Sequence, residues 1–277
     1  MQKINLDQTI NSGQVFLWKK LNDTWYGVNG QNILSVNKDL EIFSYKKEKL
    51  DFFRQEDNLK KIFDHISKDK VIRDAVKKFS GLRLLRQDPF QCYISFIVSS
   101  NSNIQNIRSS LQHICEKFGR KIKFHGMEFH LFPEPDKLAL ASNVELASCG
   151  LGYRTKFVKE ASLAVIKNKI DFDFLKKTDY KTAKESLLEV FGIGNKVADC
   201  ILLFSLEKLE AIPLDRWILK SLQDYYSKKF SFDGKTLTDK KYQILHDELI
   251  EYFGEYAGYS QQFLFKMIRD ENQKKWL

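Results

Sequence analysis

The stretch from Leu187 to Phe204 constrains the fold most, because two glycines separated by one isoleucine interrupt an apolar pattern of helical spacing. Apolar residues at this spacing lie on both sides of the glycines, at Leu187, Leu188, Val190 and Phe191 and again at Val197, Ile201, Leu202 and Phe204. The pattern predicts a helix, a tight hairpin at Gly192-Ile193-Gly194 and a second helix. Glycine allows positive φ and carries no Cβ, so another molecule can approach this hairpin closely.

The second predicted helix begins with Asn195 as its expected N-cap and has Lys196 in its first turn. The partial positive charge at a helix N-terminus disfavours the ammonium form of a lysine, which does not help stability. A neutral amine is what a nucleophilic attack requires. The position of Lys196 therefore suggests catalysis, although a lysine considered alone is more often an ordinary solvent-exposed residue.

A further helix start follows after one helix and a return loop, at Pro213-Leu214-Asp215. Pro213 ends the preceding segment, and Asp215 is well placed to cap the next helix. A capping carboxylate that accepts backbone N–H bonds is expected to stay ionised. Lys196 and Asp215 would then both lie at helix N-termini beside the glycine hairpin.

The chain is basic, with 45 Lys and Arg against 36 Asp and Glu among 277 residues and a formal charge of +9. This excess suggests an anionic partner such as nucleic acid. No apolar run approaches the roughly 20 residues of a membrane span, and the first residues lack the core of a signal peptide. We therefore expect an intracellular protein, in the cytoplasm or nucleoid or in a eukaryotic nucleus, without a membrane partner.

The four cysteines, Cys92, Cys115, Cys149 and Cys200, are far apart in the sequence. The five histidines are equally scattered. Zinc and iron–sulfur sites need clustered ligands, so the sequence predicts no metal site and no disulfide framework. We also expect no cofactor.

The order of elements predicts an α+β fold. Alternating residues predict four antiparallel strands at 14–20, 24–28, 32–36 and 41–45, with a type I′ hairpin at Asn29-Gly30. From Lys46 onward the spacing is helical, first from Leu50 to Phe79, then from a start at Asp88-Pro89, and later in one helix over 138–147. Segment 121–136 is predicted to be a loop, and the lysine-rich segment 227–241 an exposed loop or helix end.

Strands and helices do not alternate, so a parallel sheet is not expected. We divide the chain into an N-terminal antiparallel sheet domain with flanking helices, residues 1–80, and a mostly α-helical domain, residues 81–277. The helical domain would comprise two subdomains with the active site in the cleft between them.

Motifs spread over nearly the whole chain resemble those of the 8-oxoguanine DNA glycosylases of the helix–hairpin–helix superfamily. The hairpin motif is present as Gly192–Cys200 and the aspartate motif as Ile212–Asp215. The other matching segments are Ser12–Trp18, Gly81–Pro89, Ser99–Asn101, Gly150–Arg154 and Tyr256–Phe265. A helix–hairpin–helix alone is common, but these motifs occur together and in order.

The resemblance implies a bifunctional glycosylase and AP lyase that acts on duplex DNA containing 8-oxoguanine, as a monomer. Lys196 would attack C1′ of a flipped nucleotide, displace the oxidised base and form a Schiff base, after which β-elimination nicks the strand. Asp215 would stabilise the positive charge that develops on the sugar. An amine is needed because only an imine intermediate leads to β-elimination.

The resemblance also assigns a pocket for the flipped base. The carbonyl of Gly13 would accept the N7–H that oxidation adds to guanine, Cys200 and Phe265 would sandwich the base, and Gln261 would bond its Watson–Crick edge. The resemblance also assigns DNA-binding residues around this pocket and the hairpin: Asn101, Tyr153, Arg154, Gly192, Gly194 and Arg216. Among them Tyr153 would wedge into the stack, and Asn101 and Arg154 would contact the base left behind.

One position departs from the family. Members that insist on cytosine opposite the lesion carry an arginine five residues after the asparagine that matches Asn101, and here that position is Asn106. A neutral amide cannot make the bidentate charged contact. We therefore predict a weaker preference for the opposite base, unless Arg108 substitutes.

Each of these residues also has a purely structural interpretation, for instance a helix cap for Asp215 or a core position for Cys200 and Phe265. Two other functions stay open. One is a glycosylase of the same superfamily for another damaged base, and the other is a non-catalytic DNA-binding module that holds phosphates with its hairpin amides. Retention of both Lys196 and Asp215 argues against the second, since binding alone needs neither.

Overall fold

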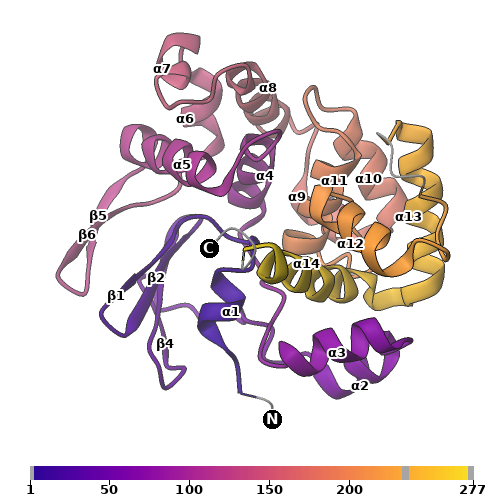
Figure 1. The fold of residues 1–277 in the computed structure, drawn as a ribbon. Helices are drawn as coiled ribbons and strands as arrows, with labels where there is room; N and C mark the ends of the chain where they lie inside the picture. The colour runs from indigo at the N-terminus through magenta and orange to yellow at the C-terminus, as the bar shows by residue number, and fades with distance from the viewer. Residues whose placement is uncertain (1–2, 233–236, 274–277) are drawn as a thin grey trace.

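The computed structural model describes residues 3–232 and 237–273, and it has an antiparallel sheet followed by helices, so the predicted α+β class is confirmed (Figure 1). The four strands of the sheet are β1 (Trp18–Leu21), β2 (Thr24–Asn29), β3 (Asn32–Val36) and β4 (Ile42–Ser44). They form a meander in the order β1-β2-β3-β4. All four predicted strands are therefore present.

The two central strands, β2 and β3, are buried on both faces. Tyr26, Val28 and Ile33 belong to the large core shared with the helices. Their neighbours in sequence point the other way, and Trp25 and Leu34 join a smaller core. The short helix α1 (Leu6–Ile10) contributes Ile10 to this smaller core. The alternation that predicted the strands thus reflects two different apolar partners rather than one apolar and one solvated face.

Two details of the sheet differ from the prediction. The tight turn is formed by Gly30 and Gln31, because Asn29 is the last residue of β2 and pairs with Asn32. Of the two turn residues only Gly30 has positive φ, at +58°, so the predicted type I′ turn at Asn29-Gly30 is wrong. The first strand begins at Trp18 rather than at residue 14, because Gln14 instead bonds the backbone of Arg83 and Leu85.

Residues 50–58 form turns rather than the predicted start of a helix. The side chain of Asp51 accepts a hydrogen bond from the backbone N–H of Gln55 at 2.6 Å, which closes a turn. Phe52 and Phe53 pack on Trp18 with ring centroids 5.2 and 6.0 Å away, so their apolar character serves the smaller core. Helices α2 (Leu59–Ile66) and α3 (Lys70–Lys78) follow.

The next part of the chain is a helical group around α4. Asp88 caps α4 through the N–H of Gln91 and Pro89 is its first residue, so the predicted start is confirmed. The elements of this group are α4 (Pro89–Val98), α5 (Ile104–Phe118), α6 (Pro135–Leu140), α7 (Asn143–Ala147) and α8 (Arg154–Ile166).

Segment 121–136 is not a loop throughout. It contains a second hairpin of β5 (Lys121–Phe124) and β6 (Met127–His130), which pair in antiparallel register. Phe129 of this hairpin stacks on Tyr26 of the sheet, which gives the short strands a tertiary partner. The single helix predicted over 138–147 is two helices, because Ser142 starts α7 with a capping box to Glu145.

The last group of helices carries the glycine hairpin, and Figure 1 shows α14 running between this group and the sheet. Its helices are α9 (Phe172–Lys177), α10 (Tyr180–Leu188), α11 (Asn195–Ser205), α12 (Arg216–Tyr226), α13 (Asp239–Phe253), the short 3-10 helix η1 (Gly254–Tyr256) and α14 (Ala257–Gln273). Of the lysine-rich segment 227–241, residues 233–236 lie outside the described residues, and α13 begins within its last part.

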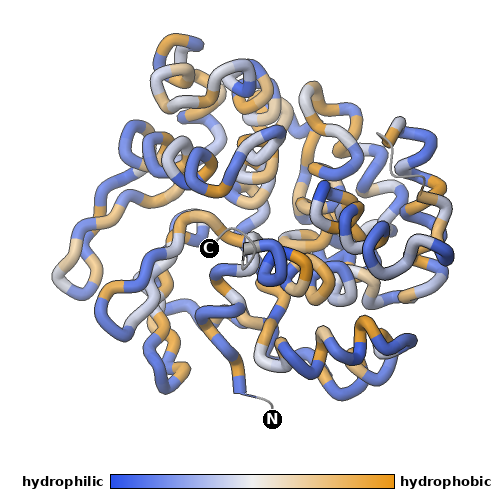
Figure 2. The backbone as a smooth tube through the Cα atoms, in the orientation of Figure 1, coloured by the Kyte–Doolittle hydropathy of each residue, from blue (hydrophilic) through white to orange (hydrophobic). Residues whose placement is uncertain are grey.

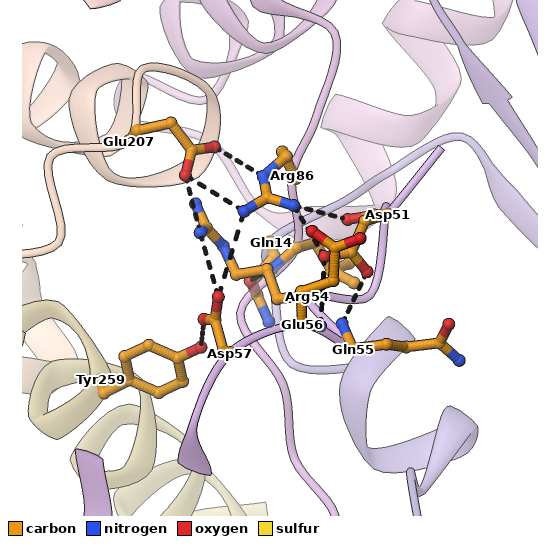
Figure 3. A network of polar contacts seen from close by, with 10 residues as sticks. Gln14, Asp51, Arg54, Gln55, Glu56, Asp57, Arg86, Glu207 and Tyr259 are labelled. Carbon is orange, nitrogen blue, oxygen red and sulfur yellow. Dashed lines mark hydrogen bonds and ion pairs between the residues drawn. The ribbon is translucent and has the colours of Figure 1, made fainter. Parts of the chain in front are cut away.

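A polar network joins the N-terminal part of the chain to these helices (Figure 3). Glu207, which follows α11, accepts hydrogen bonds from the fully buried Arg54 at 2.8 Å and from Arg86 at 2.9 Å. Burial opposes ionisation of Glu207, yet Arg54 and Arg86 hold the pKa of that carboxyl below its ordinary value. Tyr259 on α14 donates to Asp57 in the same network. The beginning of α14 is thereby fixed against residues 51–57 and 86.

Apolar and polar residues alternate along the helices, as amphipathic packing requires (Figure 2). Residues 3–232 and 237–273 include no helix long and apolar enough to cross a membrane. The four cysteines are free and buried. Over the same ranges, no group of three or more His, Cys, Asp or Glu side chains is arranged to hold a metal ion.

Candidate active site

A cavity of about 1230 Å³ lies where the N-terminal loop, the α4–α5 loop, α11, α12 and α14 meet. Nine of the predicted site residues line it, namely Gly13, Asn101, Gly194, Lys196, Cys200, Asp215, Arg216, Gln261 and Phe265. They come from segments far apart in the sequence, so the fold brings the predicted constellation together. Tyr153, Arg154 and Gly192 do not line the cavity.

Lys196 lies in the first turn of α11, as predicted, with its side chain directed into the cavity. Its Nζ is 3.4 Å from Ser99 Oγ and 5.4 Å from the centre of the Phe96 ring. No carboxylate among the described residues forms an ion pair with it within 4.0 Å. The amine is half-buried, and its neighbours are the Ser99 hydroxyl, the Phe96 ring face, the Cys200 thiol and the more distant charge of Asp215, so it faces a molecule in the cavity.

Asp215 caps α12, and its Oδ1 accepts the N–H groups of Trp217 and Ile218, both at 2.9 Å. The predicted cap is confirmed. Burial raises the pKa of Asp215, while the charge of Lys196 and the two N–H donors oppose that rise. Sequence analysis expected simple stabilisation of the carboxylate by its cap. It missed the burial, which depends on the walls of the cavity rather than on the local motif.

Cys200 forms part of the cavity wall one helical turn after Lys196, so both side chains lie on the same face of α11. Its side chain is buried, and burial raises the pKa of the thiol to about 12. The thiol is therefore neutral at physiological pH and acts here as an apolar surface rather than as a nucleophile.

Three residues of α14 at four-residue spacing face the cavity: Gln261, Phe265 and Arg269. Gln261 is 4% exposed, and its Oε1 has no hydrogen-bond partner among the described residues. A buried amide oxygen without a partner is costly, so this atom is suited to accept a hydrogen bond from a ligand. The ring of Phe265 offers a flat apolar surface beside it.

Gly13 is in direct contact with Phe265. It has φ +84°, and a Cβ built on it would lie 3.0 Å from Phe265 Cε1 and 3.4 Å from Arg269 Nη1. A side chain here would be strained and would also push the ring. The glycine therefore lets the N-terminal loop approach α14, and Gln262 fixes this approach by donating to the Ser12 carbonyl at 2.9 Å.

The two hairpin positions suit glycine for different structural reasons. Gly192 has φ +94°, and a Cβ on it would overlap Phe157 of α8 at 2.3 Å. Gly194 is exposed with open space around it, and it is the N-cap of α11. The predicted cap, Asn195, is instead the first helical residue and donates to Asp239 at 3.0 Å, so that prediction is wrong. Because no side chain caps α11, its first N–H groups are available to an anion.

Tyr153, Arg154 and Asn101 lie together at the edge of the cavity. The Arg154 guanidinium is 4.5 Å from the centre of the Tyr153 ring and donates to the carbonyls of Ser100 at 2.7 Å and Asn101 at 2.9 Å. Asn101 has φ +48° and its amide donates to the Tyr153 hydroxyl at 3.4 Å. Tyr153 is 54% exposed. Arg154 thus holds the loop that presents an exposed aromatic ring and an amide.

Two arginines line the cavity. Arg216 is exposed in the first turn of α12, and Arg269, which sequence analysis missed, lies 5.3 Å from the centre of the Phe265 ring. Burial lowers the pKa of Arg269, Asp215 opposes that shift, and the charges of Arg108 and Arg216 add to it. The helical spacing from Gln261 and Phe265 was the signal that could have identified Arg269.

Both halves of the chain match families of DNA repair proteins. Residues 1–93 match the N-terminal domain of 8-oxoguanine DNA glycosylases, and residues 94–244 match the HhH-GPD superfamily of base excision DNA repair proteins.

Individual relatives match over nearly the whole chain. The N-glycosylase/DNA lyase OGG1 of Arabidopsis thaliana is 30% identical over 95% of this chain and 77% of its own length. The N-glycosylase/DNA lyase of Saccharomyces cerevisiae is 28% identical over 94% of this chain and 82% of its own. The 8-oxoguanine glycosylase/lyase of Clostridium acetobutylicum, solved with double-stranded DNA containing cytosine opposite 8-oxoguanine, has a TM-score of 0.86 and 28% identity, covering 97% and 93% of the two chains.

Proposed function

Because the chain belongs to the HhH-GPD superfamily of base excision DNA repair proteins and carries the N-terminal domain of the 8-oxoguanine DNA glycosylases, we propose that it excises 8-oxoguanine from duplex DNA with Lys196 as the nucleophile. The observation that carries this proposal is the meeting of Lys196 and Asp215 in one cavity, each at the N-terminus of a helix. The two relatives described above are named as enzymes that combine glycosylase and lyase activities.

The chemistry begins when the neutral amine of Lys196 attacks C1′ of the flipped nucleotide. The bond from C1′ to the base breaks, the base leaves with its electron pair, and the sugar ring opens to a Schiff base with Lys196. β-Elimination then removes a proton from C2′, forms the C2′–C3′ double bond and breaks the bond from C3′ to its oxygen, so the phosphate leaves and the strand is nicked. Asp215, as a carboxylate beside this site, stabilises the positive charge that develops on the sugar.

Recognition of the base uses other residues that line the same cavity. The carbonyl of Gly13 accepts the N7–H of 8-oxoguanine, and the base stacks between Phe265 and Cys200. Gln261, whose Oε1 otherwise lacks a partner, bonds the Watson–Crick edge. Normal guanine has no hydrogen on N7, so it leaves the Gly13 carbonyl unsatisfied and binds less well.

The DNA is held outside the cavity. The exposed N–H groups at Gly194 and the cation of Arg216 contact phosphates, with Gly192 setting the hairpin against α8. Tyr153 inserts into the stack, and Asn101 and Arg154 face the base left behind. The division into residues 1–80 and 81–277 implies that both parts are needed, since Gly13 comes from the first. We infer that one chain suffices and that it acts on DNA within the cell.

Borohydride trapping on a panel of duplexes tests this function. The wild-type protein is incubated with duplexes that contain 8-oxoguanine, another damaged base such as 3-methyladenine, or undamaged guanine. The proposal predicts a covalent adduct and strand cleavage with 8-oxoguanine alone. Adducts only with a different lesion would identify a glycosylase for another base, and DNA binding without any adduct would identify a non-catalytic binder.

Substitution of Gly13 tests the base pocket. Gly13→Ala places a methyl group against Phe265 at a positive φ, which costs about 1 kcal/mol of backbone strain and displaces the ring. We expect single-turnover excision of 8-oxoguanine to fall about tenfold or more, because the base and C1′ shift together. Gly126→Ala is the matched control, since Gly126 has φ +76° but open space around it. Equal excision rates for the two variants would contradict the assignment of Gly13.

Asn106 makes the preference for the opposite base testable. It is exposed at the edge of the cavity, and its side chain carries no charge with which to contact a base. We expect excision opposite all four bases to agree within about tenfold, and Asn106→Arg to raise the preference for cytosine about tenfold or more. A hundredfold cytosine preference of the wild-type protein, roughly the upper value for one bidentate contact, would contradict this interpretation. Arg108→Gln would then show whether Arg108 supplies the contact.

A further inference from the structure

A buried polar network adjoins the cavity, which Tyr242 helps to line, and centres on Asp199, which follows Lys196 by three residues on α11. The Asp199 side chain is fully buried. Its Oδ1 accepts from the Tyr180 hydroxyl at 2.5 Å, and its Oδ2 accepts from the Tyr242 hydroxyl at 2.6 Å and from Lys184 Nζ at 3.1 Å. The donors come from α10 and α13, so Asp199 joins three helices.

The network is charged and tightly packed. Burial raises the pKa of Asp199, while the Lys184 ammonium and the two hydroxyl donors oppose that rise. His246, which contacts the Tyr180 hydroxyl at 2.8 Å, has its pKa lowered to about 3 by burial and by Lys184, so it is neutral. One buried cation therefore accompanies one buried carboxylate. Such groups are expensive to bury, and none of them is needed for the chemistry proposed above.

Tyr242 differs from the other donors because its oxygen also contacts the chain next to Asp215. The backbone N–H of Leu214 donates to the Tyr242 hydroxyl at 3.1 Å. The side-chain bonds of Asp215 run to α12 itself, so they do not fix α12 relative to α11. The phenol of Tyr242 supplies that missing link, since it bonds α11 through Asp199 and the loop before α12 through Leu214.

We propose that Tyr242 is a positioning residue, which sets the separation of Lys196 and Asp215 through the hydrogen bonds from Leu214 to Tyr242 and from Tyr242 to Asp199. This inference rests on the proposed function, because it concerns the rate of that chemistry. The two reacting groups lie on different helices, and a shift of 1 Å between them can cost about a hundredfold in rate. The network fixes the loop of one group to the helix of the other.

Tyr180 provides a matched control within the same network. Tyr180→Phe and Tyr242→Phe each remove one hydroxyl that donates to Asp199. Tyr180→Phe in addition removes an acceptor of Lys184 Nζ at 2.9 Å and the partner of His246 at 2.8 Å, so we expect it to lower the free energy of unfolding at least as much as Tyr242→Phe. Only Tyr242→Phe also leaves the Leu214 N–H without its acceptor.

The test measures single-turnover excision at saturating enzyme, together with the Kd for an 8-oxoguanine duplex, for the wild-type protein and both variants. We expect Tyr242→Phe to lower the excision rate about tenfold while its Kd changes less than about twofold, and Tyr180→Phe to excise at nearly the wild-type rate. A second variant carries leucic acid in place of Leu214, which replaces only the donor N–H by an ester oxygen. It is expected to match Tyr242→Phe, and it keeps the test valid if that variant does not fold.

The outcomes are distinct from those of the proposed function. A wild-type protein without excision or lyase activity would refute the function itself. If the wild-type protein is active, equal rates for the Tyr242 and Tyr180 variants, or a wild-type rate for the Leu214 ester, would overturn the positioning role. A loss expressed mainly in Kd would also overturn it, since positioning of the reacting groups acts on the chemical step.

Discussion

Lys196→Gln is expected to abolish both the borohydride-trapped adduct and strand nicking, and to lower excision of 8-oxoguanine by more than about 10³-fold. Glutamine keeps much of the side-chain length and its packing on Phe96, but it has no basic nitrogen to attack C1′. Lys196 contacts the Ser99 hydroxyl rather than a carboxylate, so its loss breaks no direct ion pair. It does remove the charge that opposes the raised pKa of Asp215, and that carboxyl can then take up a proton rather than stay as a buried charge. The variant should therefore fold normally and bind lesion DNA with little change in Kd.

Lys77→Gln is the control for this substitution. Lys77 lies exposed on α3 and does not line the cavity, so it reports only the effect of removing one positive charge. We expect its excision rate and adduct yield to equal those of the wild-type protein. An undiminished adduct from Lys196→Gln would assign the Schiff base to a different amine.

Asp215→Asn is expected to lower the excision rate by about 10²- to 10³-fold without weakening the fold. Asparagine is as good an N-cap as aspartate, so the bonds to the Trp217 and Ile218 N–H groups are retained. What is lost is the negative charge beside the sugar. Asp215→Ala removes both charge and cap, and it should in addition lose about 1 kcal/mol of stability. Comparing the two by thermal unfolding and single-turnover excision separates capping from catalysis.

The raised pKa of Asp215 gives this prediction a pH dependence. Since burial places the folded pKa above the unfolded value, ionisation of Asp215 costs folding free energy as pH rises through the folded pKa. Asp215→Asn removes this cost, so its free energy of unfolding at pH 7 should be at least that of the wild-type protein. Catalysis needs the carboxylate, so the wild-type rate should fall when pH drops through the same raised pKa. A variant that excises at the wild-type rate would contradict the role of the charge.

The fold was predictable where local chemistry decides it. The strands, the Asp88-Pro89 start of α4 and the Asp215 cap of α12 all follow from residue patterns within a few positions. The predictions failed where distant contacts decide. Phe52 and Phe53 lie in a stretch whose apolar spacing is helical, but they pack on Trp18 in a turn. The β5–β6 hairpin was missed because its short strands are stabilised by the contact of Phe129 with Tyr26 of the sheet.

The candidate site divides in the same way. The residues suggested by motifs, such as Lys196, Asp215 and Gln261, meet in one cavity, but their roles in the reaction stay predictions. The burial that raises the pKa of Asp215 and the bridge from Asp199 through Tyr242 to Leu214 could not be predicted, because they arise only when α11, α12 and α13 pack together. Arg269 is an intermediate case: it was not predicted, although its helical spacing from Phe265 would have placed it on the correct face of α14.

In the proposed reaction one amine, that of Lys196, becomes covalently bonded to the DNA. The most direct measurement traps the wild-type protein on an 8-oxoguanine duplex with borohydride, digests the complex and locates the modified peptide by mass spectrometry. We expect a single sugar adduct on Lys196, in the peptide that contains Gly192–Cys200. An adduct on another lysine or on the N-terminal amine, with Lys196 unmodified, would contradict it.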